Sequence, residues 1–99
     1  MDSSLRGYPK YLGYHQVPQG VCGIYVCLDI NENVLYVGQS RNIRKRFGSH
    51  SRLNDICKNG FKWLVTIPAP KDYLDYEENK WILRLNPMLN IMPVRGRGK

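Results

Sequence analysis

The stretch from Leu35 to His50 is the part of the chain best suited to chemistry. It begins as an apolar strand, turns at Gly38 and continues as a basic segment with helical spacing. Arg46 and His50 are one helical turn apart, so a cation and a titratable imidazole lie on one side of that helix. The planar donor fork of arginine suits phosphate oxygens. We therefore expect this stretch to bind an anion.

A second helix carries a carboxylate on an unexpected face. Its spacing predicts a helix that ends near Leu85, and Glu78 falls near the middle of its apolar side, whereas Glu77 lies toward the flank. The apolar stripe is formed by Leu74, Trp81, Ile82 and Leu85. An unpaired carboxylate is costly there, so it should be paired, protonated or bound to a metal. The alternatives are a metal ligand and a salt bridge to Arg46 or Lys62.

Two tyrosines belong to a predicted hairpin over residues 21–38. Apolar residues alternate from Val21 onward, turn residues follow, and a second strand returns. If Asp29 pairs with Val34, Tyr25 and Tyr36 share one face, opposite the aliphatic side chains. A phenol or an imidazole can position water or take its proton, a carboxylate can hold a hard divalent cation, and arginine can stabilise charge on a phosphate. Together these groups meet the requirements of metal-assisted phosphodiester hydrolysis.

The overall charge favours a polyanionic partner. The 99 residues include 15 Lys and Arg against 8 Asp and Glu, a formal net charge of +7. Nucleic acid is the first candidate for such a partner, and charge that only aids solubility is the alternative. No apolar run reaches the roughly 18–20 residues of a membrane span, and no signal-peptide core is evident. We expect an intracellular, cytoplasmic protein, at the nucleoid or in a phage-infected cell, without a membrane partner.

The remaining elements can be placed by their breakers and caps. Residues 1–20 are expected to be an irregular N-terminal extension, whose tyrosines at every third position either stack on bases or pin the segment to the domain. A third strand is predicted over residues 61–67, and Asp72 is a candidate N-cap for the second helix. The three cysteines form no C-x-x-C pair, which argues against a disulfide framework or a structural zinc. Residues 93–99 form a basic tail.

Several ordered motifs together resemble the GIY-YIG nucleases. The second motif has valine in place of isoleucine, and the resemblance extends to Glu78, Pro87 and Asn90 in the C-terminal half. The motifs are Gly23-Ile24-Tyr25, Tyr36-Val37-Gly38, Asn42-Ile43-Arg44-Lys45-Arg46 and His50. This resemblance implies an α+β fold, an α/β sandwich with a three-stranded antiparallel sheet flanked by helices, over a nuclease domain spanning residues 21–92.

The same resemblance implies a role for each site residue. Tyr25 would activate or orient the attacking water, with Tyr36 and His50 assisting proton transfer, and which of the three is the general base stays open. Arg46 would hold the scissile phosphate. Glu78 would bind one Mg²⁺ or Mn²⁺.

Other polar residues are expected to support this centre. Asn90 would brace the site, and Gly38 would permit close approach at the strand end. Arg41, Arg44 and Lys45 are assigned to ordinary DNA phosphate contacts, which position DNA without reading its sequence. The expected activity is therefore a divalent-metal-dependent DNA endonuclease that nicks as a monomer or cuts both strands as a homodimer. An accessory protein could supply its specificity.

Two other interpretations stay open. A nuclease-like fold could bind nucleic acid without cutting it, which basic charge and tyrosines support equally well. A purely structural protein could use Glu78 and Arg46 as a buried salt bridge, and removing one partner would then destabilise it.

Overall fold

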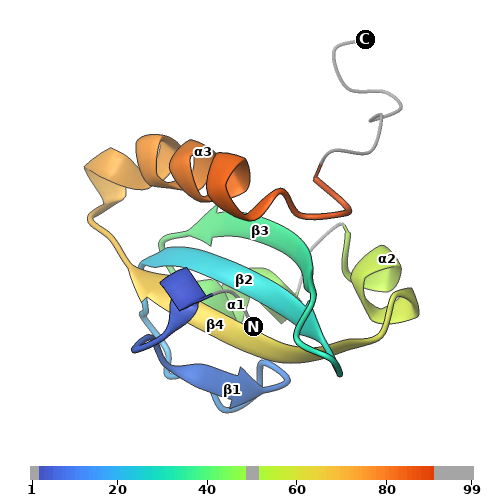
Figure 1. Cartoon of the computed structure of the whole chain (residues 1–99). Coiled ribbons are helices and arrows are strands. Elements are labelled where there is room, and N and C mark those ends of the chain that lie inside the picture. Colours follow the sequence, from blue (N-terminus) through green and yellow to red (C-terminus); the bar gives the residue numbers. More distant parts are fainter. Residues whose placement is uncertain (1–2, 49–51, 91–99) are drawn as a thin grey trace, which may run out of the picture.

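The predicted hairpin forms one side of a four-stranded sheet in a computed structural model that describes residues 3–48 and 52–90. β2 (Gly23–Asp29) pairs with β3 (Val34–Ser40) on one side and with β4 (Phe61–Pro68) on the other, both antiparallel. β1 (Lys10–Leu12) pairs with β4, so the strand order is β1-β4-β2-β3 (Figure 1). The α+β class is confirmed, with four strands where three were predicted.

The fourth strand comes from the segment that was expected to be irregular. β1 has only three residues, too few to show alternation among the glycines and prolines around it. Leu5 and Val17, on either side of it, are fully buried. Tyr8 packs edge-on against Trp81. The N-terminal segment is therefore attached to both faces of the sheet, which is the packing alternative for its aromatic residues.

The hairpin register agrees with the prediction except beside the turn. Tyr25 lies opposite Gly38 and Cys27 opposite Tyr36, as expected. A bulge after Cys27 then sets Leu28, not Asp29, opposite Val34. Asp29 instead accepts hydrogen bonds from backbone N–H groups in the turn, so its carboxylate shapes the loop rather than the ladder. The two tyrosines keep the same face because the bulge lies beyond them.

Both faces of the sheet are covered. α3 (Leu74–Leu85) and the 3₁₀ turn Ser3–Leu5 pack on the face that carries Ile24, Val26 and Leu28. α1 (Ile43–Gly48) and α2 (Leu53–Lys58) pack on the other face, which carries Tyr25 and Cys27. The result is a sheet between two apolar layers, with α3 beside β3 and α1 behind the sheet (Figure 1).

The helices end as predicted, but the predicted N-cap of α3 is wrong. Ile43 and Phe47 are buried as the inward face of α1. Asp72 does not cap α3; it lies in a 3₁₀ turn (Lys71–Tyr73), and α3 begins at Leu74 without a side-chain cap. At the other end, Asn86 adopts a left-handed conformation where the helix was expected to stop. Across residues 3–48 and 52–90, no helix is long and apolar enough to cross a membrane.

Candidate active site

The hairpin brings two phenols together on one face. The rings of Tyr25 and Tyr36 are 6.3 Å apart between centroids; Tyr25 is 1% exposed and Tyr36 is half-buried. Gly38 lies directly opposite Tyr25, and a side-chain carbon added at Gly38 would overlap the Tyr25 ring. The glycine of the Tyr-Val-Gly motif therefore leaves the space that this ring occupies.

Arg46 reaches the phenols from α1. Its guanidinium donates a hydrogen bond to the phenol of Tyr25, while the residue as a whole is exposed. Phe47, the next residue, packs edge-on against the Tyr25 ring and anchors the helix. Two side chains cap the start of the helix: Ser40 Oγ accepts the backbone N–H of Asn42 at 3.0 Å, and Asn42 Oδ1 accepts that of Lys45 at 3.5 Å. A cation is thus held beside a buried phenol at the molecular surface.

Both phenols are neutral at pH 7, because the pKa of a tyrosine is ordinarily near 10 and burial raises it further here. Burial raises the pKa of Tyr25 well above its usual range, the neighbouring Tyr36 adds to this, and Arg46 partly opposes it. Burial also raises the pKa of Tyr36, while Arg52 lowers it and Glu78 raises it. A neutral phenol can donate a hydrogen bond and accept one, so both tyrosines are suited to orient a water molecule.

Glu78 approaches from α3, on the other layer. It is half-buried, and its Oε1 accepts a hydrogen bond from the side-chain amide of Gln39 at 2.9 Å. In the described part of the chain it forms no ion pair with Arg46 or Lys62, the two partners considered in the sequence. Glu77 instead lies 3.2 Å from Lys80. Of the two neighbouring glutamates, Glu78 is the one directed at the hairpin.

Asn90 braces β3 from its outer edge. Its Oδ1 accepts the backbone N–H of Val37 at 2.7 Å, and its Nδ2 donates to the carbonyl of Val37 at 2.9 Å. This amide therefore takes the place of a neighbouring strand at the residue between Tyr36 and Gly38. It touches the backbone of the motif rather than either phenol.

The structure places the other predicted residues less closely. His50 falls outside the described residues. Arg41 and Lys45 are exposed and Arg44 is half-buried, all within or just before α1. They precede Arg46 along the same short segment of chain, from the residues before α1 to its last turn.

Sequence reasoning missed three polar residues near this centre. Arg52 lies 5.7 Å from the centre of the Tyr36 ring and donates a hydrogen bond to the carbonyl of Leu89 at 3.3 Å. Gln39 and Asp75 form the other part of the Glu78 network. Strand alternation could have identified Gln39, because the residue after Gly38 must point to the opposite face. Nothing in the sequence distinguishes Arg52 from other loop arginines.

The carboxylates suit a hard divalent cation better than a transition metal. Glu78 and Asp75 supply oxygen ligands, and both have access to solvent. Among the residues that the structure describes, no three His, Cys, Asp or Glu side chains gather as a metal-binding group. Mg²⁺ usually keeps several waters and binds one or two carboxylates, so this sparse oxygen set fits it.

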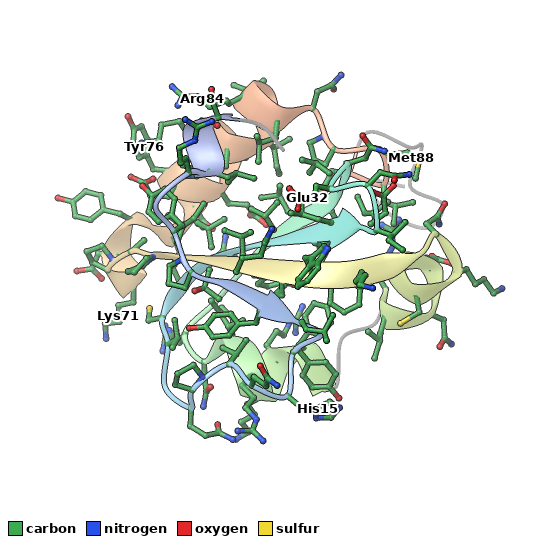
Figure 2. All side chains as sticks on the ribbon, turned by 60° about the horizontal axis from the view of Figure 1, so that its bottom comes forward. His15, Glu32, Lys71, Tyr76, Arg84 and Met88 are labelled. Carbon is green, nitrogen blue, oxygen red and sulfur yellow. The ribbon has the colours of Figure 1, made fainter. Side chains whose placement is uncertain are left out.

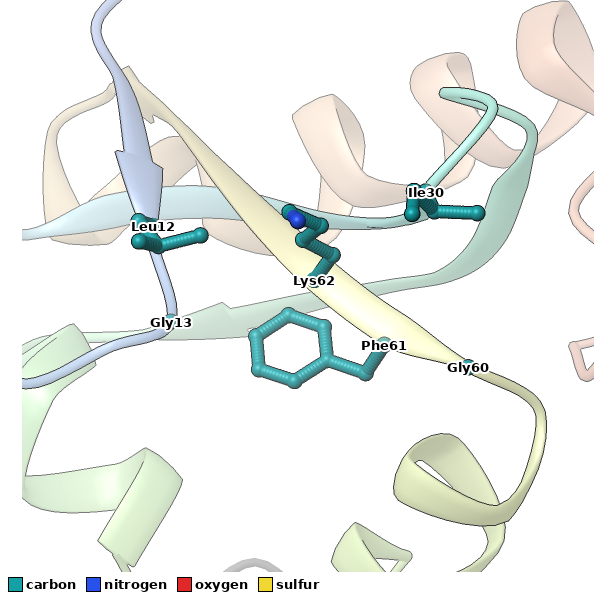
Figure 3. A pocket seen from close by; sticks show the side chains of 6 residues that line it. All are labelled: Leu12, Gly13, Ile30, Gly60, Phe61 and Lys62. Atoms are coloured by element: carbon teal, nitrogen blue, oxygen red, sulfur yellow. The ribbon is translucent and has the colours of Figure 1, made fainter.

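One hollow in the surface lies away from these residues. An open pocket of about 570 Å³ is lined by residues from the β1 end, the hairpin turn and the start of β4 (Figure 3). Phe61, which lines it, pairs with Asp29, whereas Tyr25 pairs with Thr66 further along β4. The phenol centre is therefore at the other end of the sheet from this pocket.

Fold and site together define a small catalytic domain of the nuclease class, with phenols from a hairpin, arginine from the next helix and a carboxylate from a distant one. The family model described as the GIY-YIG catalytic domain matches residues 21–90. The chain therefore belongs to the GIY-YIG family, as the motifs indicated.

Curated relatives agree with this membership. The chain is 29% identical over 98 residues to UvrABC system protein C of Ruegeria pomeroyi, covering 92% of this chain and 16% of that protein. It is 31% identical over 80 residues to the protein of the same name from Corynebacterium jeikeium, covering 71% of this chain and 11% of that protein. It is also 26% identical over 49 residues to the uncharacterized protein YurQ of Bacillus subtilis, covering 50% of this chain and 40% of that protein.

The chain thus spans about a sixth or less of the two UvrABC proteins. No solved structure gave a significant match.

Proposed function

We propose that the chain is a divalent-metal-dependent DNA endonuclease that hydrolyses one phosphodiester bond per encounter. The observation that carries this proposal is the grouping of two phenols and Arg46 on one face of the sheet, with Glu78 on the other side of β3 near enough to raise the pKa of Tyr36. The net charge of +7 supports DNA as the partner. Membership of the GIY-YIG family supports the reaction class.

Each residue has a role that its surroundings allow. Tyr25 orients the attacking water through its phenol oxygen, and the Arg46 guanidinium, which already contacts that phenol, holds the scissile phosphate. Because arginine presents a planar fork of donors, it also stabilises the charge that develops on the phosphate oxygens. Tyr36 and His50 assist proton transfer. Asn90 holds the backbone of Val37, the residue between Tyr36 and Gly38, in place.

Glu78 would hold the metal ion, Mg²⁺ or Mn²⁺, and Asp75, which binds the same Gln39 amide, adds a second carboxylate nearby. When bound, such an ion supplies Lewis-acid stabilisation of charge on the phosphate and the leaving oxygen. The basic residues in and just before α1, which are Arg41, Arg44 and Lys45, would contact the DNA backbone through non-specific phosphate contacts.

Plasmid cleavage tests the proposal directly. Purified protein is incubated with supercoiled plasmid and with branched DNA, in Mg²⁺ or Mn²⁺ and with a chelator as control. We expect metal-dependent cleavage, abolished by Glu78→Gln and retained by Glu77→Gln, since Glu77 pairs with Lys80 at the flank. Salt-sensitive DNA binding without cleavage, unchanged by Glu78→Gln, would instead indicate a non-catalytic binding module.

The product form tests the single-site aspect. One site per chain cuts one strand, so a monomer should convert supercoiled plasmid first to open circles. Linear product at the earliest times, rising with protein concentration, would require a homodimer or an accessory protein that presents a second site.

A further inference from the structure

Gln39 connects the hairpin motif to the carboxylates of α3. Its side-chain nitrogen lies 2.6 Å from Asp75 Oδ1 and 2.9 Å from Glu78 Oε1. Both acceptors are carboxylate oxygens, and hydrogen bonds to ionised acceptors are shorter and stronger than those between neutral groups. We infer that Gln39 is a positioning residue that holds the Glu78 carboxylate in place for the metal ion, with Asp75 as its second anchor. This inference rests on the proposed function.

The strand fixes where this amide can be. Gln39 pairs with Ile24 of β2, whose side chain lies in the layer covered by α3. Strand alternation therefore directs Gln39 away from the phenols and toward α3. Consecutive residues of β3 therefore serve opposite faces of the sheet. Gly38 makes room for Tyr25 on one face, and Gln39 binds Glu78 on the other.

The chemistry of the amide explains why a glutamine fits. Asp75 and Glu78 are three residues apart on one helix, where like charges repel. An amide NH₂ has two hydrogens and no charge, so it can donate one to each carboxylate and hold the pair together. It leaves the second oxygen of Glu78 able to bind a cation, and it adds no positive charge that would compete with that cation.

If Gln39 only tied β3 to α3, losing its hydrogen bonds would destabilise the fold; a positioning role predicts a different result. α3 is already seated by Leu74 and Trp81, each 5% exposed, within the apolar layer. Loss of the Gln39 hydrogen bonds should therefore leave the fold stable. If the amide positions a ligand, metal affinity should fall while the maximal rate at saturating metal survives.

Direct Mn²⁺ binding, followed by the loss of the free-ion EPR signal, tests this on the full chain. Gln39→Met keeps the side-chain length and removes the donors, and Gln39→Ala is a second variant with the same loss. Gln16→Met, at an exposed position of the N-terminal segment, is the matched control. We expect the Kd for Mn²⁺ to rise roughly tenfold in both Gln39 variants, as for other residues that orient metal ligands. It should not change in the control.

Plasmid nicking gives the second readout. The Mg²⁺ concentration for half-maximal rate should rise by the same factor, and the rate at saturating Mg²⁺ should return close to that of the unmodified chain. A lower melting temperature, together with a rate that saturating Mg²⁺ does not restore, would make Gln39 a structural tie and overturn the inference.

The outcomes separate this inference from the proposed function. If the unmodified chain binds Mn²⁺ through Glu78 and Gln39→Met binds it equally well, the positioning role is wrong and the endonuclease proposal stands. If the unmodified chain neither binds Mn²⁺ nor cuts DNA, both are wrong.

Discussion

Position 38 of the site requires a glycine, because the Tyr25 ring occupies the space where a larger side chain would be. We expect Gly38→Ala to displace that ring and weaken its hydrogen bond to Arg46. A shift of about 1 Å in a catalytic group can lower a rate about a hundredfold, and overpacking costs about 1–3 kcal/mol of stability. Plasmid nicking and urea unfolding measure the two effects.

Gly48→Ala is the matched control for this change. A side-chain carbon at Gly48, at the end of α1, would meet only the Tyr14 ring, at 3.9 Å, which is ordinary van der Waals contact. It should leave nicking nearly unchanged. Equal losses in the two variants would contradict the specific role of Gly38.

The buried phenol of Tyr25 should also give the fold a particular alkaline limit. Its pKa is about 10 in the unfolded chain and is raised by burial in the folded one, so the folded state binds more protons above pH 10. The stability from the neutral phenol is fully present below about pH 10 and is lost as the pH rises further. The slope for this one proton is up to about 1.4 kcal/mol per pH unit.

Urea unfolding at a series of pH values above and below 10 measures this slope. Tyr25→Phe has no proton to lose at this position and should show a shallower decline than the unmodified chain. Tyr76→Phe, at a side chain that is 64% exposed on the outer side of α3 (Figure 2), should behave like the unmodified chain. Identical slopes for all three proteins would show that burial of Tyr25 does not carry the effect.

The residues that could be predicted are those whose type conflicts with their pattern. Glu78 interrupts an apolar stripe, and Tyr25 faces away from the aliphatic side of its strand, so the sequence alone distinguishes both residues. Gln39 could have been identified from strand alternation, but Asp75 and Arg52 conflict with no local pattern. Their importance arises from tertiary neighbours, which spacing along the chain does not specify.

At the scale of elements, the edge strand β3 depends on the segment that follows α3. Backbone N–H groups of Met88 and Leu89 donate to the carbonyls of Val34 and Leu35, at 3.4 and 2.9 Å. Asn90 then satisfies both outward backbone groups of Val37. An edge strand whose polar groups are covered in this way is also protected against pairing with another chain.

Asn90→Ala should therefore destabilise the fold as well as the site. It removes two hydrogen bonds and leaves both backbone groups of Val37 without this partner, at a cost of about 2 kcal/mol in the free energy of unfolding. Asn79→Ala, at an exposed position of α3, should change stability by no more than about 0.5 kcal/mol. Urea unfolding of both variants checks this; similar small changes in both would mean that Asn90 contributes little to β3.

Element prediction succeeded where the pattern was long and failed where it was short or broken. The hairpin and α3 have enough residues to show their period, and the register of Tyr25 followed from it. β1 has three residues, and the bulge after Cys27 depends on how Asp29 bonds to the turn rather than on hydrophobic alternation. The turn Lys71–Tyr73 likewise replaces the predicted Asp72 cap without a sequence signal.

At the scale of the whole molecule, the site requires the two layers to stay aligned across one thin sheet. Tyr25 and Arg46 belong to the layer of α1, and Glu78 belongs to that of α3. β3 connects the two layers, because Tyr36 lies beside Tyr25 on one face and Gln39 binds Glu78 on the other. Anything that loosens the seat of α3 should therefore move Glu78 relative to the phenols.

Leu5 tests whether the N-terminal segment is part of that seat. It is fully buried in the same apolar layer as Leu74 and Trp81, although it lies nearly seventy residues away in sequence. Leu5→Ala removes buried methyl groups and leaves a cavity, so we expect the free energy of unfolding to fall by about 3 kcal/mol. That is a large share of the roughly 5–15 kcal/mol by which an ordinary domain is stable against unfolding. As the temperature rises, α3 should loosen at a lower temperature in this variant, and the nicking rate should fall with it.

Leu83→Ala makes the same chemical change at a leucine that is 83% exposed on α3, and it should alter stability by no more than about 0.5 kcal/mol. Urea unfolding followed by tryptophan fluorescence compares the two variants, since Trp81 reports on the layer that Leu5 supports. If Leu5→Ala is as mild as Leu83→Ala, the N-terminal segment lies outside the cooperative unit. A large loss confined to Leu5→Ala would mean that residues before the matched family region belong to the same cooperative unit as α3, the helix that carries Glu78.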